Sequence, residues 1–326
     1  MVKNILVTGG AGYIGSHVSE ILIKQKKNVF IVDDLSTGFR KLINKKSIFF
    51  HSSILKKKNI KKIINNNNID SIIHLAAALS VGESQKKPKK YFNINVKGTK
   101  NILDAIRGSK VKNIIFSSTC AVYKDGLSKV SEASKLKPTS IYGKTKLQGE
   151  KLIKSFCKKN KINYGILRFF NVAGASLSGK IGQINKGDQL FKNLSVEIFK
   201  KKPHFKIYGD NYKTPDGTCI RDYIHVSDIA DIHLQVLLKL NKLSKSIILN
   251  CGYSKGISVK QVIKEFKKYS KKEVILKFLS KRKGDMEKII ADTKKLKKFI
   301  NWKPKHNSLK LIVKSCIKWE NRIKNN

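Results

Sequence analysis

The sequence lacks the features that mark a secreted, membrane-spanning or metal-binding protein. Its five cysteines lie far apart and form no C-x-x-C pair, so they predict no disulfide framework and favour a reducing compartment. No apolar run approaches the ~20 residues of a membrane-spanning helix. No charged leader precedes the first apolar run at residues 4–8, and the seven histidines form no H-E-x-x-H motif. These absences predict a cytoplasmic protein without a metal or a membrane partner.

Acidic residues are also scarce, with 22 Asp and Glu against 69 Lys and Arg and a formal net charge of +47. A balance this basic is typical of proteins that bind nucleic acid or an anionic membrane. Here the excess is spread along the whole chain, and all but six of the 69 basic residues are lysine. We therefore interpret the charge as solvated lysine faces and expect no specific nucleic-acid partner. A polyanion-binding role is the alternative.

Hydrophobic residues make up 40% of the 326 residues, which is enough for a sizeable core and about two domains. In the first half, short apolar runs alternate with helical stretches. This alternation predicts an α/β fold with a doubly wound parallel sheet covered on both faces. The expected strands are residues 4–8, 28–33, 47–50, 71–75, 113–118 and 163–168. The expected helices between them are residues 13–25, 55–66, 91–107 and 141–159.

The alternation stops after residue 168, where a Gly- and Ser-rich loop follows. The second half predicts a smaller C-terminal domain that interleaves with the sheet. We expect one domain at residues 1–170 and another at 171–326, with some segments of the latter returning to the sheet. The helices expected there are residues 189–200, 226–240, 258–269 and 308–322, and the strands are 247–250 and 274–278.

A glycine pattern, TGGAGYIG, directly follows the first expected strand and opens a helix. Gly9 permits a tight turn, Gly12 lets a pyrophosphate approach the backbone, and Gly15 lets helix and strand pack closely. The N-terminus of the helix then offers N–H groups to phosphates. This context predicts a dinucleotide site, and the alternative is a glycine turn without a ligand.

Asp33 ends the second expected strand, close to the spacing of about 20 residues at which an acid binds the adenosine ribose. A carboxylate there accepts the 2′-hydroxyl and repels a 2′-phosphate, which favours NAD over NADP. The next residues would form the loop beside the adenosine. The alternative is that Asp33 only caps a turn.

Tyr142 and Lys146 stand four residues apart in an expected helix and therefore share one face. A phenol with its usual pKa of about 10 is a poor base at neutral pH. We expect the lysine ammonium, together with the positive nicotinamide ring of NAD, to lower the pKa of Tyr142 and make it a general base for an alcohol. Thr119, just past the end of an expected strand, is placed to hold the reacting oxygen. In a chain this rich in lysine, a chance pair is the alternative.

Together these motifs resemble the extended short-chain dehydrogenase/reductase family, in its NAD-dependent epimerase/dehydratase branch, and within it the UDP-glucose 4-epimerases. The stretches that carry the resemblance span nearly the whole chain in the family's order. They are TGGAGYIGSH (8–17), HLAA (74–77), VGES (81–84), NINV (93–96), SST (117–119), YGKTK (142–146), RFFNVAGA (168–175), DGTCIRDYIHV (216–226) and RKGD (282–285).

The resemblance implies a Rossmann-type sheet that holds NAD tightly and a UDP-sugar site largely in the second domain. The residues implied to contact NAD are Gly9, Gly12, Tyr13, Ile14, Gly15, Asp33, Asp34, Leu35, Ser36, Thr37, Gly38, Ser53, Ile54, Leu75, Ala76, Ala77, Ala78, Asn95, Lys146 and Phe170. Those implied to line the UDP-sugar site are Thr119, Tyr142, Asn171, Leu190, Tyr208, Arg221, Arg282 and Asp285.

The rare arginines support this assignment, because the planar fork of Arg221 or Arg282 suits a diphosphate in a way that an ammonium does not. Tyr208 is expected to pack on uracil or its ribose, with a core position as the alternative. For Arg168 we expect an internal structural pair.

The implied reaction interconverts UDP-galactose and UDP-glucose. Tyr142 removes the proton of the sugar 4-hydroxyl, hydride moves from C4 to NAD, and its return to the opposite face inverts C4. The resemblance also implies a homodimer through a helix bundle of residues 91–107 and 141–159.

The sequence departs from the family pattern at several places, which include Lys124 in place of a turn glycine and Gln189 before Leu190. Ser53 stands where the family has an Asp on adenine, and Ile289 has intermediate bulk where size limits N-acetylated sugars. Another epimerase or decarboxylase of the branch, such as a UDP-N-acetylhexosamine 4-epimerase, therefore stays open. A 4,6-dehydratase is disfavoured because Cys120 and Ala121 follow Thr119. A non-catalytic NAD-binding protein is a further alternative.

Overall fold

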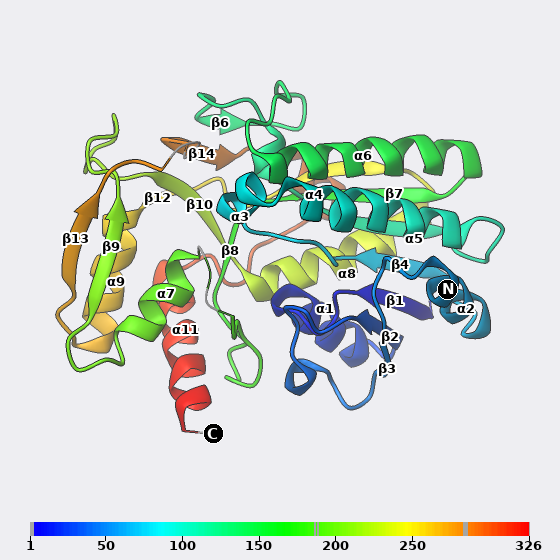
Figure 1. The fold of residues 1–326 in the computed structure, drawn as a ribbon, viewed down its shortest axis with the longest axis horizontal. Coiled ribbons are helices and arrows are strands. Elements are labelled where there is room, and N and C mark those ends of the chain that lie inside the picture. Colours follow the sequence, from blue (N-terminus) through cyan, green and yellow to red (C-terminus); the bar gives the residue numbers. More distant parts are fainter. Residues whose placement is uncertain (1–2, 186, 188, 283–285, 326) are drawn as a thin grey trace.

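The computed structural model of the chain describes residues 3–185, 187, 189–282 and 286–325. A seven-stranded sheet lies in the right-hand part of the molecule in Figure 1, and each pair of neighbouring strands in it is parallel. In order across the sheet, the strands are β11 (Ile247–Cys251), β7 (Asn163–Phe169), β5 (Asn113–Thr119), β4 (Ser71–His74), β1 (Asn4–Thr8), β2 (Asn28–Asp33) and β3 (Ile48–His51).

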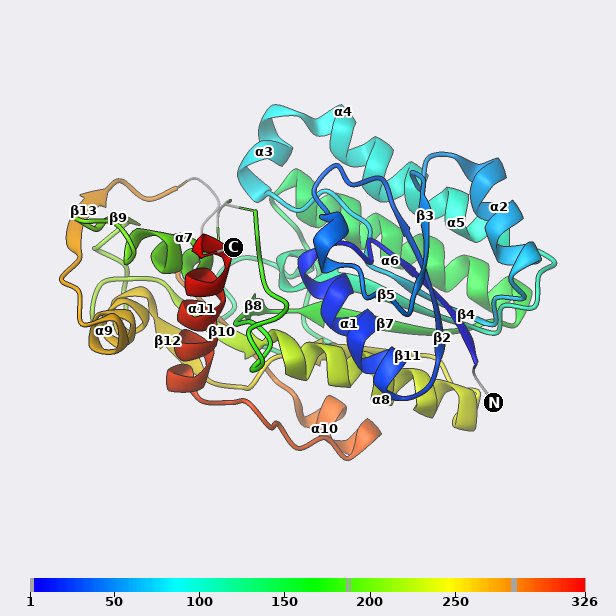
Figure 2. The same ribbon diagram turned by 90° about the horizontal axis from the view of Figure 1, so that it is seen from below.

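Helices cover both faces of this sheet, which explains why its strands are almost continuously apolar (Figure 2). On one face α1 (Tyr13–Lys24) packs against α8 (Val226–Leu243). On the other face lie α2 (Lys57–Asn66), α5 (Gly98–Ile106) and α6 (Ile141–Asn160). The doubly wound α/β fold predicted from the sequence is confirmed, and the six strands expected in the first half end within one residue of their predicted bounds.

The order of strands reverses beside β1, because the chain first builds β2 and β3 on one side and then places β4 on the other. The carboxyl ends of β1 and β4 therefore lie side by side. Such a reversal is where ligands bind in open α/β sheets. The turn at Gly9 and the segment after His74 meet at this place.

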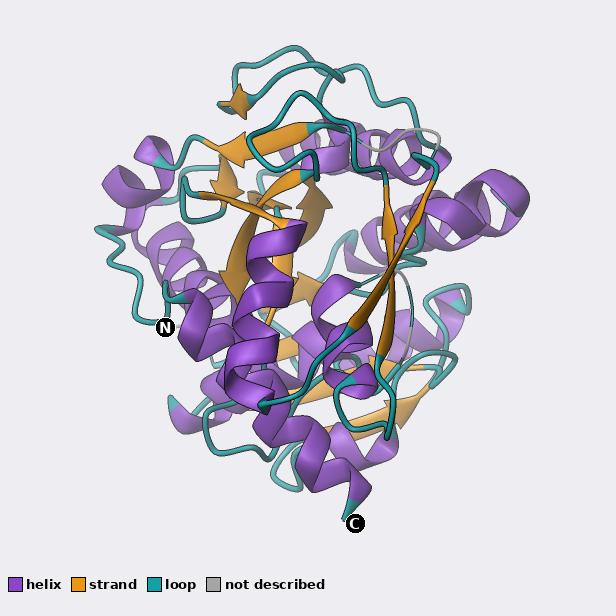
Figure 3. Ribbon diagram, turned by 90° about the vertical axis from the view of Figure 1, so that its left-hand side faces the viewer, coloured by secondary structure: helices purple, strands orange, loops and turns teal. Residues whose placement is uncertain are grey.

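The other strands form two smaller sheets, which Figure 3 turns toward the viewer. The five-stranded sheet contains β12 (Gly256–Ser258), β10 (Ile220–His225), β14 (Lys288–Ala291) and β6 (Lys129–Val130), with β8 (Asn171–Ala173) paired to β10. The second is a parallel pair of β9 (His204–Tyr208) and β13 (Ile275–Leu279). The nearby helices are α7 (Leu190–Glu197), α9 (Val259–Ser270), α10 (Lys294–Ile300) and α11 (Leu309–Lys324).

Two segments cross between these parts of the molecule. β11, from the second half of the chain, completes the large sheet beside β7, and β6, from the first half, pairs with β14. The halves are thus interleaved in space. A domain boundary at residue 170 stays a prediction.

The segment expected to form one helix at residues 91–107 is helical but changes type along its length. After α3 (Val81–Lys86), α4 (Pro88–Tyr91) runs into six residues of π-helix, Phe92–Lys97, before α5 begins. Such π-segments often occur at functional sites. Here the segment carries Asn95, whose side chain is buried.

Candidate active site

The glycine turn packs closely against the backbone of the segment after β4 and against the start of α1. Gly9 has φ +74°, and a Cβ there would lie 2.7 Å from the backbone N of Ala76. A Cβ on Gly15 would lie 2.1 Å from the carbonyl O of Gly9. Gly12 is the N-cap residue of α1, with no side chain of the described residues capping it and no acid in the first turn. The turn therefore fits a pyrophosphate, for which the first N–H groups of α1 are suitable donors.

Asp33 connects the end of β2 to this turn. Its Oδ2 accepts a hydrogen bond from Ala11 N at 3.0 Å, and its Oδ1 accepts one from Leu35 N at 2.9 Å. Burial raises the pKa of Asp33, while those two backbone donors oppose the rise. A Cβ on Gly38 would lie 2.7 Å from Oδ1, so only glycine leaves this carboxylate unobstructed. Each carboxylate oxygen keeps a second lone pair, which suits a ribose hydroxyl.

The loop after Asp33 is fixed by short-range contacts. Asp34 Oδ1 accepts hydrogen bonds from Ser36 N at 3.1 Å and Ser36 Oγ at 2.6 Å. Leu35 has φ +58°, and the carbonyl O of Thr37 accepts a bond from Asn185 Nδ2 at 2.6 Å. The predicted adenosine loop is thus a defined turn beside the glycine segment.

Two other predicted cofactor residues follow β3. Ser53 Oγ accepts a hydrogen bond from Leu55 N at 3.3 Å. The side chain of Ile54 is buried in the core under α2 and α5 and lies against Gly98. Any contact of Ile54 with a cofactor would therefore be made through its backbone.

The segment Leu75, Ala76, Ala77 and Ala78 follows β4 and is held from two sides. Thr8 accepts hydrogen bonds from Leu75 N through its carbonyl O and from Ala76 N through its hydroxyl. Asn95 Oδ1 accepts from Ala78 N at 2.8 Å, and Asn95 Nδ2 donates to Ala78 O at 3.1 Å and to Thr145 Oγ1 at 3.0 Å. The amide of Asn95 thus ties this segment to α6.

Tyr13, Ile14 and Phe170 lie where the first and second halves of the chain meet. The Tyr13 hydroxyl donates to Gly174 O at 2.6 Å, and burial raises its pKa. Ile14 is half-buried against the α1–α8 core. Phe170 is buried in a small cluster with Ile289.

The expected base lies at the carboxyl end of β5. Tyr142, in the first turn of α6, lies close to the hydroxyl of Thr119, which accepts a hydrogen bond from Ala121 N at 3.2 Å. Burial raises the pKa of Tyr142 to about 12, and the nearby Thr119 hydroxyl opposes the rise. The sequence-based expectation concerns Tyr142 beside the lysine ammonium and the positive nicotinamide ring of NAD, and it stays a prediction.

Lys146 is itself deeply buried, one turn further along α6. Its Nζ donates to Ser117 Oγ at 3.4 Å and lies 4.5 Å from the centre of the Phe116 ring. Burial lowers the pKa of Lys146 to about 7, and Glu150 opposes the fall. The ammonium expected beside Tyr142 thus titrates near neutral pH.

Arg168 makes the internal pair expected of it. Its Nη2 lies 2.8 Å from Glu150 Oε2 and its Nε donates to Glu150 Oε1 at 2.9 Å. Its Nη1 donates to the Tyr123 hydroxyl at 3.0 Å. Both charged side chains are almost fully buried, and the prediction of a structural pair is confirmed.

Arg221, one of the two arginines predicted to bind the diphosphate, lies on β10. Its Nη1 donates to the carbonyl O of Ile220 at 3.0 Å and of Glu287 at 3.4 Å. Its charge opposes the burial that raises the pKa of Cys120 to about 11, and the Cys120 thiol in turn acts on Tyr142. The Arg221 charge therefore lies within electrostatic reach of the end of β5.

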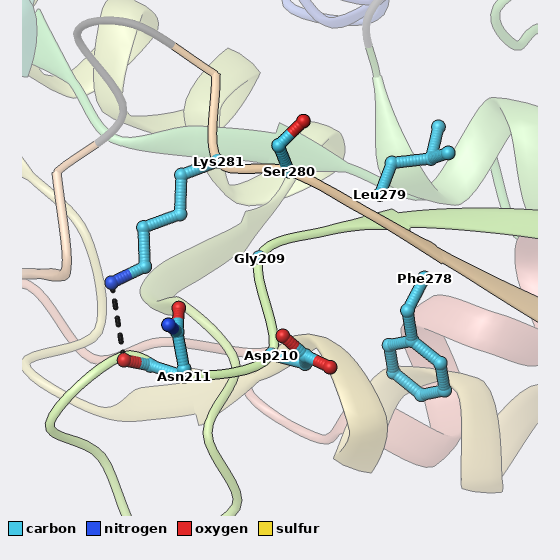
Figure 4. A pocket seen from close by; sticks show the side chains of 7 residues that line it. All are labelled: Gly209, Asp210, Asn211, Phe278, Leu279, Ser280 and Lys281. Carbon is cyan, nitrogen blue, oxygen red and sulfur yellow. Dashed lines mark hydrogen bonds between the residues drawn. The ribbon is translucent and has the colours of Figure 1, made fainter.

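Arg282 and Tyr208 lie together in the region of β9 and β13. The Arg282 guanidinium lies 4.4 Å from the centre of the Tyr208 ring, a cation–π arrangement. A cavity of about 500 Å³ lies between residues 209–211, which follow Tyr208, and residues 278–281, which precede Arg282 (Figure 4). Its lining residues are Gly209, Asp210, Asn211, Phe278, Leu279, Ser280 and Lys281, with Lys281 Nζ donating to Asn211 O at 3.1 Å. Among the described residues this lining includes neither Tyr142 nor Arg221, so the cavity adjoins only the predicted uridine side.

The three other residues predicted to line the sugar site, Asn171, Leu190 and Asp285, come from separate parts of the second half of the chain. Asn171 is exposed at the start of β8, opposite Tyr223 of β10. Leu190 opens α7 and packs on the core of the second half. Asp285 lies outside the described residues.

Two side chains near the base were not predicted from the sequence, namely Ser84, which contacts α6 from α3, and Glu150, which belongs to α6 itself. Ser84 Oγ accepts a hydrogen bond from Tyr142 N at 3.1 Å, and Glu150 lies one turn beyond Lys146. A signal for Glu150 was present, because it is the one acid in the 20 residues of α6. Ser84 belongs to the VGES stretch, but nothing in its spacing points to α6.

The sequence also predicted no disulfide framework, no metal site and no membrane-spanning helix. Its five cysteines are free, and it holds no group of His, Cys, Asp and Glu side chains arranged for a metal ion. Of the helices within it, none combines the length and apolar character that crossing a membrane requires.

Comparison with known proteins identifies relatives of the whole chain. Residues 5–252 match the NAD dependent epimerase/dehydratase family. A UDP-glucose 4-epimerase of Lactobacillus helveticus is 37% identical over 319 residues, which cover 97% of this chain and 96% of that protein. The structure of a UDP-glucose-4-epimerase from Stenotrophomonas maltophila with bound NAD and formylated UDP-arabinopyranose has a TM-score of 0.95 at 32% identity, covering 99% of both chains. That of a UDP-Glc/GlcNAc 4-epimerase from Campylobacter jejuni has a TM-score of 0.85 at 36% identity, covering 98% of this chain and 99% of that one. The chain therefore belongs to the NAD-dependent epimerase/dehydratase family.

Proposed function

We propose that this protein is an NAD-dependent UDP-glucose 4-epimerase that interconverts UDP-galactose and UDP-glucose. The observation that carries the proposal is the placement of Tyr142 beside Thr119 at the carboxyl end of β5, one helical turn from the buried Lys146. The similarity over nearly the whole chain to proteins named UDP-glucose 4-epimerase supports it.

The residues at the glycine turn would hold the cofactor. The N-terminus of α1 would bind the pyrophosphate, the carboxylate of Asp33 the adenosine ribose, and Lys146 the nicotinamide side. The bound NAD supplies the acceptor that takes hydride from sugar C4 and returns it to the other face.

The chain's own residues move the proton and hold the substrate. Tyr142 takes the proton of the sugar 4-hydroxyl and returns it after inversion, while the hydroxyl of Thr119 orients both oxygens. Because burial raises the pKa of Tyr142 to about 12, the phenol acts as a base at neutral pH only with positive charge close by. Lys146 and the cofactor are the sources that the proposal assigns.

The nucleotide part of the substrate would be held by side chains of the second half. The forks of Arg221 and Arg282 suit the diphosphate, and the ring of Tyr208 suits uracil. Asn171, Leu190 and Asp285 complete the site as we propose it. Holding the nucleotide at several points leaves the hexose free to present either face of C4.

Purified protein that receives UDP-galactose and no added cofactor is expected to form UDP-glucose and to release a dinucleotide on denaturation. Tyr142→Phe is expected to keep the dinucleotide but to turn over about 1,000-fold more slowly, because general-base catalysis is lost. Tyr164→Phe, which removes a phenol from β7 away from the site, serves as the control and keeps its activity. Near-full activity in Tyr142→Phe would mean that another group is the base.

The residue at position 289 bears on whether the protein also accepts an N-acetylated UDP-sugar. Ile289 is buried beside Phe170, and the similar Campylobacter jejuni protein is named a UDP-Glc/GlcNAc 4-epimerase. We propose that UDP-N-acetylgalactosamine is a slower substrate, which the same assay tests directly.

The proposal includes a homodimer that packs residues 91–107 and 141–159 into a helix bundle, and a location in the cytoplasm. The exposed ring of Phe92 within that surface supports the first part. Light scattering of the purified protein tests it, since a monomeric mass would contradict the bundle.

A further inference from the structure

Three ionisable side chains form one row along α6. Tyr142, Lys146 and Glu150 are spaced four residues apart, and side chains at that spacing lie above one another on a helix. The first two are the proposed base and its cation. The third has no role in the reaction as described so far.

Glu150 is buried and its carboxylate is fully bonded. Oε2 lies 2.8 Å from Arg168 Nη2, while Oε1 accepts hydrogen bonds from Arg168 Nε at 2.9 Å and Ser118 Oγ at 2.5 Å. A buried acid needs such partners to stay ionised. The carboxylate of Glu150 is therefore paired with Arg168, one turn from Lys146.

The surroundings of Lys146 provide little else to hold its proton. From β5 it faces Ser117 Oγ at 3.4 Å and the Phe116 ring. From β4 it faces His74, which bonds to Thr8 Oγ1 and Thr99 Oγ1. Burial, together with Lys146, lowers the pKa of His74 to about 3, so this imidazole is neutral.

The charges that act on Lys146 therefore have opposite signs. Glu150 favours the ammonium, as the direction of its effect on the pKa of Lys146 shows. Arg168 carries a permanent positive charge and is paired with the same carboxylate. Tyr142 lies one turn away on the other side of Lys146 and is thus further from both.

We propose that Glu150 is a positioning residue for the reaction, because its carboxylate keeps Lys146 in the ammonium form beside Tyr142 while Arg168 limits the effect. This inference rests on the proposed function for the role of Tyr142. Glu150 acts through Lys146 and does not itself contact substrate or cofactor.

The test removes the two charges one after the other in the purified holoenzyme. Glu150→Gln leaves Arg168 unbalanced beside Lys146, so the pH above which turnover falls is expected to drop by about one unit. Adding Arg168→Met removes the opposing charge and is expected to move that pH back part of the way. If the pair of Glu150 and Arg168 were purely structural, the second substitution would not move that pH back toward the wild-type value.

A second readout follows Tyr142 directly. The ultraviolet absorbance of tyrosinate, taken as the difference between each protein and the same protein with Tyr142→Phe, reports ionised Tyr142. Because Glu150 is nearer to Lys146 than to Tyr142, Glu150→Gln is expected to lower this signal at neutral pH, and the double variant to recover part of it.

Two further outcomes keep the inference falsifiable. If Glu150→Gln fails to fold, the double variant serves alone, since replacing both halves of a buried pair is often tolerated. It too lacks the carboxylate, so its turnover should fall at a lower pH than in the wild type. Ser118→Ala keeps the carboxylate and should keep the wild-type pH.

If the variants without the carboxylate keep the wild-type pH and the wild-type tyrosinate signal, the inference is overturned. If the wild type instead lacks epimerase activity, the proposed function fails, while the tyrosinate signal still tests the charge of Lys146.

Discussion

At the nucleotide end of the candidate site the backbone holds the geometry, whereas at the sugar end long side chains do. Gly9 makes its turn against backbone atoms of Ala76, and the carboxylate of Asp33 is fixed by backbone N–H groups. Arg221, by contrast, reaches across to carbonyls with one end of its guanidinium, and Arg282 lies over an aromatic ring. The geometry of the nucleotide end is therefore determined by the path of the backbone, and that of the sugar end by the rotamers of long side chains.

This difference predicts how each end responds to substitution. A turn that is closed by backbone atoms cannot yield to a new Cβ without moving a strand or a helix. An arginine on a flexible stem loses only part of its contact when it is shortened or reshaped. Changes at the nucleotide end should be nearly all-or-none, and changes at the sugar end graded.

Gly15→Ala is the sharpest way to break this comparison. The new Cβ would lie 2.1 Å from Gly9 O, so α1 must move away from the turn. A strain of about 3 kcal/mol is expected, which weakens dinucleotide binding about 100-fold. Protein purified without added NAD should then release little dinucleotide on denaturation and show almost no epimerisation.

Gly108→Ala is the matched control for that substitution. Gly108 has a positive φ, +72°, which Gly15 does not have, but nothing lies within 4 Å of its added Cβ. It should cost about 1 kcal/mol of unfolding free energy and keep its dinucleotide. If Gly15→Ala retained as much dinucleotide as Gly108→Ala, the turn would be more pliable than its contacts indicate.

Arg221→Lys tests the sugar end and should have a smaller effect. Losing the fork at a diphosphate costs about 1.5–3 kcal/mol, so KM for UDP-galactose should rise about 10- to 100-fold with kcat little changed. Arg107→Lys, whose side chain is largely exposed near Asp104, is the control. A fall in kcat at constant KM would instead place Arg221 in the chemical step.

The same contrast explains which elements could be predicted from the sequence. β1 and β2 have their predicted ends because each is an apolar run that stops at a turn, which is local information. β10 was not predicted as a strand, although its segment was singled out for its residues. It pairs with β8, β12 and β14, which are short and lie far away in the chain, so no local pattern marks it.

The candidate site divides in a similar way. The approach of Tyr142 to Thr119 could be predicted, since both follow from helix spacing and the end of a strand. The burial that raises the pKa of Tyr142 in the chain without cofactor could not be predicted, because the sequence does not reveal how completely the phenol is enclosed. The π-helix around Asn95 was also missed, since it depends on packing against the segment after β4 and on α6.

Ser84 lies between the two ends and gives the smallest expected effect. Its Oγ accepts the N–H of Tyr142, a donor in the first turn of α6 that has no partner within the helix, and donates to Val81 O. Ser84→Ala removes this link between α3 and the base. We expect a loss of about 1 kcal/mol in unfolding free energy and a fall in kcat of about three- to ten-fold.

Ser140→Ala separates positioning from helix stability. Ser140 caps the same helix through Gly143 N at 3.0 Å, so its loss should cost a similar unfolding free energy. It leaves the bond from Ser84 to Tyr142 intact, however. Urea unfolding and steady-state kinetics on both variants then decide the matter, since a rate loss confined to Ser84→Ala assigns the effect to the placement of the phenol, and equal rate losses assign it to the helix as a whole.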